Sequence, residues 1–408
     1  IHERLVGSEM CIRDRYQYLS KQDRAFMTRL VDGTIEYMLQ LDYIIDSFSK
    51  TKVRKMKPFI RNLLRMSVYQ IKYMDAVPDS AVCNEAVKLA KRHKFAQLSG
   101  FVNGVLRNIA RNIDSVQFDT LSIRYSMPQW IVDRFVAAYG EKKAEEIFKA
   151  FHNKSTISIR TNLTRCTPDE LRATLEAEGV TVTAIDELNY AFVISGFDYL
   201  NGLQSFRDGL FYVQDISSML VAQTAAPKKG DYVIDVCAAP GGKSTHIAEL
   251  LQGSGHVLAR DLTDNKVDMI EENIDRHGLN NMSAEVWDAT VFDADSAGKA
   301  DILICDLPCS GLGVLGRKKD IRYKMTPESV DELAALQRQI LDTVHTYVKP
   351  NGVLVYSTCT IDEAENEDNV RWFIEKHPEF ELDKSFAEGT GMKQILPGEH
   401  GSDGFFIA

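Results

Sequence analysis

The chain has 408 residues, of which 44% are hydrophobic and 26% are charged. This length predicts two or three domains, each with a core of its own. No apolar run reaches the roughly 18 residues that a membrane span needs, and no signal peptide is visible. We therefore expect a cytoplasmic protein with no membrane partner.

The net charge of −10 would by itself argue against a nucleic-acid partner, but the charge is unevenly distributed. Residues 1–115 carry 20 Lys and Arg against 12 Asp and Glu, a balance of +8. The remainder carries 28 against 46, a balance of −18. A basic module thus precedes an acidic one, and the basic module is the better candidate for binding a phosphate backbone.

The seven cysteines include no C-x-x-C pair. Their odd number and spacing favour free thiols in a reducing compartment. A zinc site built from Cys305, Cys309 and Cys359 is the alternative. We disfavour it because Cys305 lies in an apolar strand and no fourth ligand is near, so we expect no metal.

Residues 16–115 are predicted to form an all-α bundle, because apolar residues recur at helical spacing from residue 21 to residue 112. Residues 1–15 show no clean periodicity, and we set them apart because they resemble a cloning artefact. Basic residues gather in two clusters of the bundle, which are either solvated helix faces or RNA contacts. The RNA-binding candidates among them are Arg54, Lys55, Arg61, Arg65, Lys91, Arg92 and Arg107.

Residues 116–205 are predicted to form a small α+β subdomain of the RNA-recognition type. Its pattern is a helical region, a strand ending near residue 161, a helix over 168–179 and two strands over 180–185 and 191–194. Arg160 lies at the end of the first strand, and we add it to the RNA-binding candidates.

Residues 206–408 alternate between strands and helices, which predicts a doubly wound, Rossmann-like α/β domain. We expect the last strand to be truncated. The expected strands are 232–236, 257–261, 284–287, 302–306, 353–357 and 405–407. The expected helices are 243–251, 264–276, 327–347 and 363–376.

The first of these strands leads into a turn rich in Ala, Pro and Gly, and then into a helix beginning at Lys243. Such a corner lets the backbone approach a ligand and offers unpaired helix N–H groups. Gly242-Lys243-Ser244 resembles the end of a nucleotide-binding P-loop, but Cys237 occupies the position where that motif has another Gly.

Carboxylates at later strand ends favour S-adenosylmethionine over a nucleoside triphosphate. Asp261 ends the second strand, where ribose hydroxyls are usually held, and Asp288 follows the third, where the adenine edge is expected. The predicted donor-binding residues are Cys237, Ala238, Ala239, Pro240, Gly241, Gly242, Lys243, Asp261, Asp288 and Asp306.

Two further strand ends carry thiols, Cys309 just after Asp306 and Cys359 just after residues 353–357. Carbon 5 of cytosine is a poor nucleophile until a thiolate adds to carbon 6, and a base must later remove the carbon 5 proton. Asp306 is expected to hold or protonate the ring at nitrogen 3, and Lys243 to favour the thiolate. Both thiols could instead be packing residues.

These motifs resemble the RNA (cytosine-5)-methyltransferases of the RsmB (Sun, Fmu) type in order and spacing. Residues 23–26 and 102–107 resemble the RNA-binding domain of the antitermination factor NusB, without its first helix. The resemblance implies that Cys359 is the nucleophile and that Cys309 assists release. It also implies a 16S rRNA substrate, and it assigns Arg317, Lys318 and Arg322 to the substrate side.

The resemblance leads us to expect a monomeric, S-adenosylmethionine-dependent enzyme that forms 5-methylcytosine. Three alternatives stay open from the residues: the same chemistry on another RNA, a P-loop NTPase, and a non-catalytic NusB-like RNA-binding factor.

Overall fold

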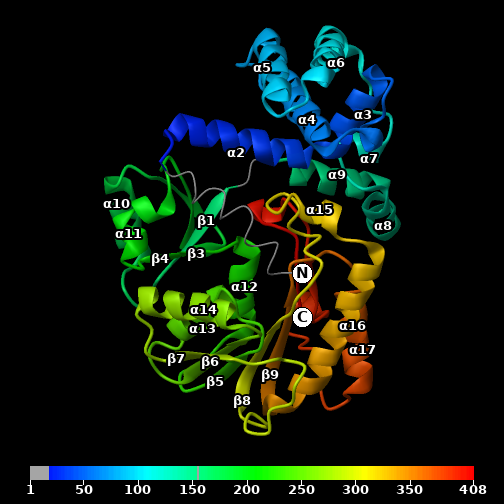
Figure 1. The fold of residues 1–408 in the computed structure, drawn as a ribbon. Coiled ribbons are helices and arrows are strands. Elements are labelled where there is room, and N and C mark those ends of the chain that lie inside the picture. The colour runs from blue at the N-terminus through cyan, green and yellow to red at the C-terminus, as the bar shows by residue number, and fades with distance from the viewer. Residues whose placement is uncertain (1–17, 154–155) are drawn as a thin grey trace. The chain divides into compact units, whose positions relative to one another are not determined.

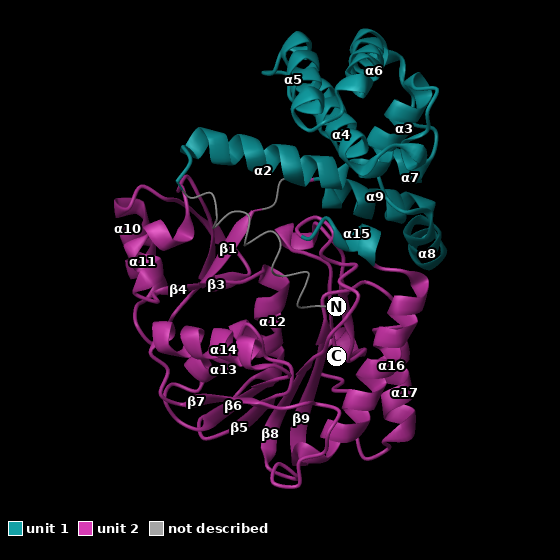
Figure 2. Ribbon diagram, viewed as in Figure 1, with its two compact units in different colours: residues 1–152, 318–324 teal, residues 153–317, 325–408 magenta. Residues whose placement is uncertain are grey.

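The structure is a computed structural model that describes residues 18–153 and 156–408. The range 1–15 that the sequence analysis set apart lies outside the described residues. The chain forms two compact units, coloured separately in Figure 2: residues 1–152 with 318–324, and residues 153–317 with 325–408. These limits differ from the predicted boundaries at 115/116 and 205/206, so the three-part division stays a prediction.

The first unit is helical (Figure 1), as the sequence predicted. It contains α2 (Lys21–Glu36), α3 (Met38–Phe48), α4 (Pro58–Tyr73), α5 (Asp79–Arg92), α6 (Ser99–Asn112), α7 (Leu121–Arg124), α8 (Gln129–Tyr139), α9 (Glu141–Phe151) and the short α15 (Ile321–Lys324). The core of α6 shows why it is a helix. Val102, Val105, Leu106 and Ile109 recur at helical spacing and are all buried.

A glycine sets the distance between α2 and α4. A Cβ atom at Gly33 would lie 2.0 Å from Cζ of Tyr69, so only a residue without a side chain lets the tyrosine ring occupy this position. Tyr69 is itself buried in the core of the bundle.

The second unit holds two sheets. The smaller has the order β2-β3-β1-β4 and is antiparallel throughout. It is built from β1 (Ile157–Thr161), β2 (Thr181–Ile185), β3 (Leu188–Ser195) and β4 (Phe211–Val213), with α10 (Pro168–Ala177) and α11 (Gln204–Arg207). Thr167 and Glu170 form a capping box that starts α10. The helix packs through Leu171 and Leu175 onto the sheet, as expected for the small α+β subdomain.

The larger sheet has the order β10-β11-β9-β8-β5-β6-β7. Five neighbouring strands are parallel: β9 (Val348–Thr358), β8 (Ala300–Asp306), β5 (Tyr232–Asp235), β6 (His256–Asp261) and β7 (Met282–Val286). β11 (Phe405–Ile407) and β10 (Lys393–Ile395) add antiparallel strands at one edge. The sequence pattern did not predict β10, and it predicted only residues 353–357 of β9.

Helices cover both faces of this sheet (Figure 1). On one face lie α12 (Ile216–Ala225), α13 (Gly242–Leu250) and α14 (Asp264–His277); on the other lie α16 (Pro327–Val344) and α17 (Glu367–Lys376). α12 was not predicted, because its buried residues surround it and leave no apolar stripe to recognise. No described helix is long and apolar enough to cross a membrane.

Candidate active site

The strand order of the larger sheet indicates where a ligand would bind. β5 is followed in the chain by β6 on one side, while β8 and then β9 lie on the other. In parallel sheets, ligands bind outside the carboxyl ends of the strands at such a reversal of order. Asp235, Asp306 and Thr358 end β5, β8 and β9, so the loops that carry the predicted residues leave the sheet together.

The donor corner has the predicted strand, turn and helix. Gly241 adopts φ 101°, which favours glycine, and precedes α13 as its N-cap without a side-chain hydrogen bond. Asp235 is buried and accepts a 2.5 Å hydrogen bond from Ser244 Oγ. Burial raises the pKa of Asp235 to about 7. The Asp235–Ser244 hydrogen bond joins β5 to α13. The first N–H groups of α13 have no partner within the helix, so they can bind a ligand at the turn.

Asp261 and Asp288 differ in how much of each carboxylate is available. Asp261 Oδ1 accepts from Leu262 N at 2.7 Å and Lys266 Nζ at 2.8 Å, whereas Oδ2 accepts from Ala239 N at 2.9 Å. Each carboxylate oxygen has two acceptor positions, so Oδ2 can take one ligand hydroxyl. Asp288 is exposed, and Thr290 bonds only its Oδ1. The two carboxylates therefore fit the hydroxyls and the adenine edge of the adenosine half of S-adenosylmethionine.

The two thiols meet. The Sγ atoms of Cys309 and Cys359 are 3.3 Å apart, although 50 residues separate them in the chain. Hydrogen bonding with Cys359, followed by burial, raises the pKa of Cys309 well above its usual value. Cys309 therefore keeps its proton at neutral pH. Cys305 lies fully buried within β8.

Lys243 and Asp306 form an ion pair beside these thiols. Lys243 Nζ lies 2.6 Å from Asp306 Oδ2, and Ser357 Oγ donates to Asp306 Oδ1 at 2.8 Å. Burial opposes the charge of Lys243, but the Asp306 carboxylate outweighs it and raises the lysine pKa. The charge of Cys359 contributes in the same direction. The lysine thus stays protonated within electrostatic reach of the thiol.

A buried polar network beneath both thiol loops was missed by the sequence analysis. Glu365 is fully buried; it accepts the Ser310 N–H at 2.8 Å and the Ser310 hydroxyl, and Gln337 Nε2 donates to it at 2.9 Å. Ser310 Oγ also lies 2.9 Å from Thr360 Oγ1. Burial, the largest cause, raises the pKa of Glu365 to about 7.

The sequence signal for this network was the polar run after Cys359. This run predicts a helix that starts at residue 363. The helix begins at Glu367, and residues 362–366 form a turn that aims Glu365 inward. Asn366 closes the turn, since its side chain accepts from Thr358 Oγ1 at 2.6 Å and donates to Thr360 O at 3.1 Å.

Gly313 locks the Cys309 loop against the Cys359 loop. Its N–H donates to Cys359 O at 3.1 Å, and its carbonyl accepts from Gly404 N at 2.9 Å. A Cβ atom at Gly313 would lie 2.3 Å from Gly404 O and 2.8 Å from Cys359 O. The close packing of three backbones fixes the separation of the thiols.

The basic candidates of the first unit divide by exposure. Arg54, Lys55, Lys91, Arg92 and Arg107 are exposed, so their charges are available to a phosphate backbone. Arg61 is half-buried. Arg65 is bound to Asp42 by two hydrogen bonds, of 2.6 Å and 2.5 Å, which leaves it less free for RNA.

Two of the other RNA candidates are buried. Arg160 is 1% exposed and donates to Glu249, Gln214 and Thr245, so we withdraw it as an RNA contact. Arg322 is fully buried and donates to the Glu36 carbonyl at 3.5 Å, and we withdraw it for the same reason. Burying a guanidinium is costly unless partners surround it, and tertiary partners decided where these residues lie.

Arg317 and Lys318 differ in how available their charges are to RNA. Arg317 Nε lies 2.5 Å from Asp403 Oδ2 and Nη2 lies 3.0 Å from Asp215 Oδ2, so it joins the start of α12 to the loop before β11. Its role here is structural. Lys318 is exposed in the segment that packs with the helical unit, and it stays a candidate.

Family models match the chain in three ranges. Residues 222–408 match the model described as 16S rRNA methyltransferase RsmB/F, and residues 4–111 match the NusB family. Residues 127–197 match the ferredoxin-like domain of RsmF/B-like methyltransferases. The NusB match begins at residue 4, inside the range 1–15 that the sequence analysis set apart.

Individual proteins resemble the chain over two thirds or more of its length. A Bacillus subtilis (strain 168) protein named probable ribosomal RNA small subunit methyltransferase B is 39% identical over 407 residues, covering 95% of this chain and 90% of the relative. The crystal structure of PH0851 has a TM-score of 0.83 at 25% identity, covering 97% and 91%. The structure of NSun6 from Pyrococcus horikoshii with SFG has a TM-score of 0.63 at 25% identity, covering 69% and 97%.

The order of the matched domains, the Rossmann-like sheet and the identity to this relative agree, and they confirm the family to which the motifs pointed. The chain belongs to the RsmB/F family of RNA methyltransferases.

Proposed function

We propose that this protein uses S-adenosylmethionine to form 5-methylcytosine in 16S rRNA, through a covalent bond between Cys359 and carbon 6 of the target cytosine. The observation that carries the proposal is the 3.3 Å separation of the Cys309 and Cys359 sulfurs at the strand reversal. An RNA methyltransferase acting on a ring nitrogen or an exocyclic amine would need neither thiol.

Attack on the ring falls to Cys359. The raised pKa of Cys309 keeps its proton in place, and protonated Lys243 favours a thiolate on Cys359. The Cys359 electron pair forms the bond to carbon 6, and the ring electrons move toward carbon 5. Asp306 would hold the cytosine edge, and its ion pair with Lys243 would balance its charge.

S-adenosylmethionine, when bound, supplies the electrophilic methyl group. The carboxylates of Asp261 and Asp288 would hold its hydroxyls and adenine edge, and the turn over residues 237–242 would face its amino-acid end. This supports the donor rather than a nucleoside triphosphate, as do the family match and a relative solved with SFG, a donor analogue.

Release falls to Cys309. Once Cys359 is bonded to carbon 6, it no longer takes part as a thiolate in the hydrogen bond that is the largest cause of the raised Cys309 pKa, while burial continues to raise it. Cys309 can then lose its proton to water, and the resulting thiolate accepts the carbon 5 proton as a base. The electron pair of that carbon–hydrogen bond restores the ring double bond, and the carbon–sulfur bond breaks to regenerate the Cys359 thiolate.

The proposed RNA partner is the small-subunit rRNA, since the Bacillus subtilis relative is named for that substrate. The exposed basic residues of the NusB-like unit support backbone binding. A base must leave its stack to reach the thiols, so we expect an unpaired cytosine to be the target. We also propose that the chain acts as a monomer.

The decisive experiment compares two thiol variants with rRNA and radiolabelled donor. Cys359→Ala should form neither adduct nor product. Cys309→Ala should transfer the methyl group and then stall, accumulating a labelled protein–RNA adduct that survives denaturing electrophoresis. The double variant should show no adduct, because the stall requires the attack.

Cys166→Ala is the matched control, because Cys166 is a half-buried thiol in the smaller-sheet subdomain. It should retain full activity. Adduct accumulation by Cys359→Ala and not by Cys309→Ala would reverse the two roles. Full activity in both single variants would refute the covalent mechanism. The alternative is the same chemistry on another RNA. Mapping 5-methylcytosine in 16S rRNA with and without the gene tests it, because an unchanged 16S rRNA would point to a different RNA substrate.

A further inference from the structure

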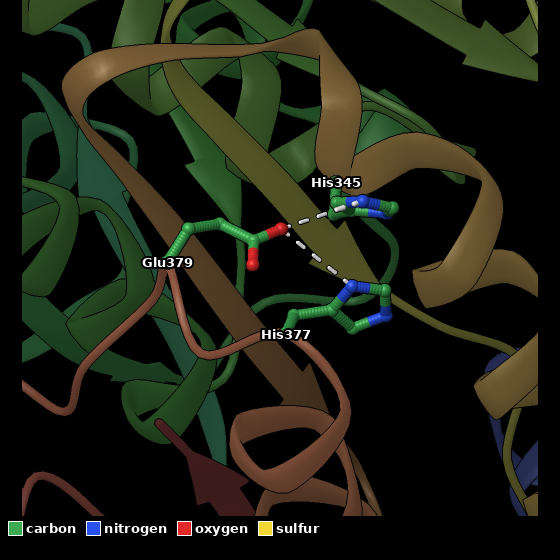
Figure 3. A group of neighbouring side chains, drawn as sticks. All are labelled: His345, His377 and Glu379. Atoms are coloured by element: carbon green, nitrogen blue, oxygen red, sulfur yellow. Dashed lines mark ion pairs between the residues drawn. The ribbon is translucent and has the colours of Figure 1, made fainter.

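Two histidines and a glutamate converge on the side of the large sheet opposite its carboxyl ends. His345 follows α16 directly, His377 caps the end of α17, and Glu379 lies two residues beyond (Figure 3). His345 precedes β9, whereas Cys359 follows it. At about 3.3 Å per residue, the 11 residues of this strand separate the cluster from the thiols by roughly 30 Å.

The distances suit a divalent metal. Glu379 Oε1 lies 3.8 Å from His345 Nε2 and 3.7 Å from His377 Nδ1, and the three potential ligand atoms all lie within 4.8 Å of one another. Tetrahedral Zn²⁺ with bonds of about 2.0–2.2 Å separates its ligand atoms by about 3.4 Å. The Glu379 side chain is 57% exposed, so it has room to make the small movement that closes the site.

The surroundings orient the rings before any metal arrives. The His345 and His377 rings pack with centroids 4.0 Å apart, and Phe373 packs 4.8 Å from His377. His377 Nε2 lies 3.2 Å from Asp342 Oδ1, so a carboxylate faces the nitrogen opposite the potential ligand atom. The contact lacks hydrogen-bond geometry, so Asp342 places a negative charge beside the ring without itself fixing the tautomer.

We propose that His345, His377 and Glu379 bind one Zn²⁺-like divalent cation that ties the end of α16 to the segment after α17. Two imidazoles and one carboxylate are a borderline-soft set that selects zinc over magnesium or calcium. A water molecule would complete the tetrahedron from the exposed side. Lys376 Nζ, 2.8 Å from Asp342 Oδ1, places a positive charge nearby and limits the affinity.

This proposal does not depend on the proposed methyltransferase chemistry, and it departs from the expectation of a metal-free protein. Its function is structural: the bridge would join two helices that cover one face of the sheet. Zinc should therefore stabilise the folded protein to a degree that rises with its concentration relative to the dissociation constant.

The test is calorimetric titration of the metal-stripped, full-length protein with zinc chloride, together with Tm measurements. Because the adjacent thiols of Cys309 and Cys359 can bind zinc themselves, all proteins carry Cys309→Ser and Cys359→Ser. We expect one equivalent to bind and Tm to rise. Adding His345→Gln with His377→Gln should weaken binding at least tenfold.

Glu379→Gln provides a second variant that should fold normally, because the side chain is mostly exposed. It should also lower the affinity. The matched control is His400→Gln with Glu187→Gln, an exposed pair joined at 2.9 Å, which should bind zinc as the parent does. No saturable binding by the parent, or equal binding by the triad variants and the control, would overturn the metal site.

Discussion

Ser310 directs both its backbone N–H and its hydroxyl to the fully buried carboxylate of Glu365. Ser310 follows Cys309, and its hydroxyl also contacts Thr360, which follows Cys359. Through Ser310, the Glu365 carboxylate therefore supports the loop of Cys309 directly and the loop of Cys359 indirectly. It touches neither thiol, so we regard Glu365 as a positioning residue, whose loss should disturb the 3.3 Å separation of the sulfurs.

Glu365→Gln should make the stability of the protein less dependent on pH. The folded-state pKa of Glu365 is raised by burial to about 7 from its usual 4.5, so folding takes up a proton between these values. Stability from this group is complete below pH 4.5 and lost as pH rises through 7, a change of about 3 kcal/mol. Gln can still bond Ser310 and Gln337 without charge.

The measurement is urea unfolding of both proteins at pH 5 and pH 8. The difference between variant and parent isolates this group from Asp235, whose pKa is also raised to about 7 by burial. The variant should gain relative stability at pH 8. Glu365→Ala, which leaves Ser310 and Gln337 without their acceptor, should lose stability at both values. Identical pH profiles for parent and Glu365→Gln would contradict the raised pKa.

Asp261→Ala should weaken S-adenosylmethionine binding about tenfold or more. A hydrogen bond to a charged group contributes about 1.5–3 kcal/mol to binding. Asp261 Oδ2 has an acceptor position left for a ribose hydroxyl of S-adenosylmethionine. Calorimetry measures the change. Asp268→Ala, which removes an exposed carboxylate on the following helix α14, serves as the control and should bind normally. Unchanged affinity in Asp261→Ala would remove Asp261 from the donor site.

Arg160→Met should destabilise the protein by roughly 3–5 kcal/mol, because it leaves the buried Glu249 carboxylate without its charged partner. Replacing both residues, Arg160→Met with Glu249→Leu, should recover much of the loss. Equilibrium unfolding in urea gives both values. A neutral single variant would show that this interior ion pair does not hold β1 to α13.

Arg107→Ala should reduce the salt dependence of RNA binding, and Arg160→Met should not. Removing one cation that binds a phosphate lowers the slope of log affinity against log salt by about 1. Arg107 is exposed on α6, whereas Arg160 is buried. Filter binding to an unpaired rRNA fragment at several salt concentrations measures the slope. Equal slopes in parent and Arg107→Ala would remove this residue from the RNA surface.

The sequence by itself predicted most of the elements of the larger sheet and the positions of the candidate site residues at its strand ends. Asp235, Asp261, Asp306 and Cys359 follow apolar strand patterns directly, and parallel strands bring their carboxyl ends to one edge. These signals are local, because hydrophobic periodicity and strand-end position need no knowledge of distant neighbours. The family resemblance then added what local patterns cannot supply, namely the expectation that Cys359 rather than Cys309 attacks.

Only the tertiary structure decided which charges face solvent and which side chains support the site. Arg160 and Arg322 look like surface cations in the sequence, but their partners Glu249 and Glu36 come from distant segments and bury them. Glu365 looked like the first turn of an exposed helix until Ser310 and Gln337 closed around it. Burial of a polar group depends on partners that complete its hydrogen bonds, and those partners are assembled by the fold.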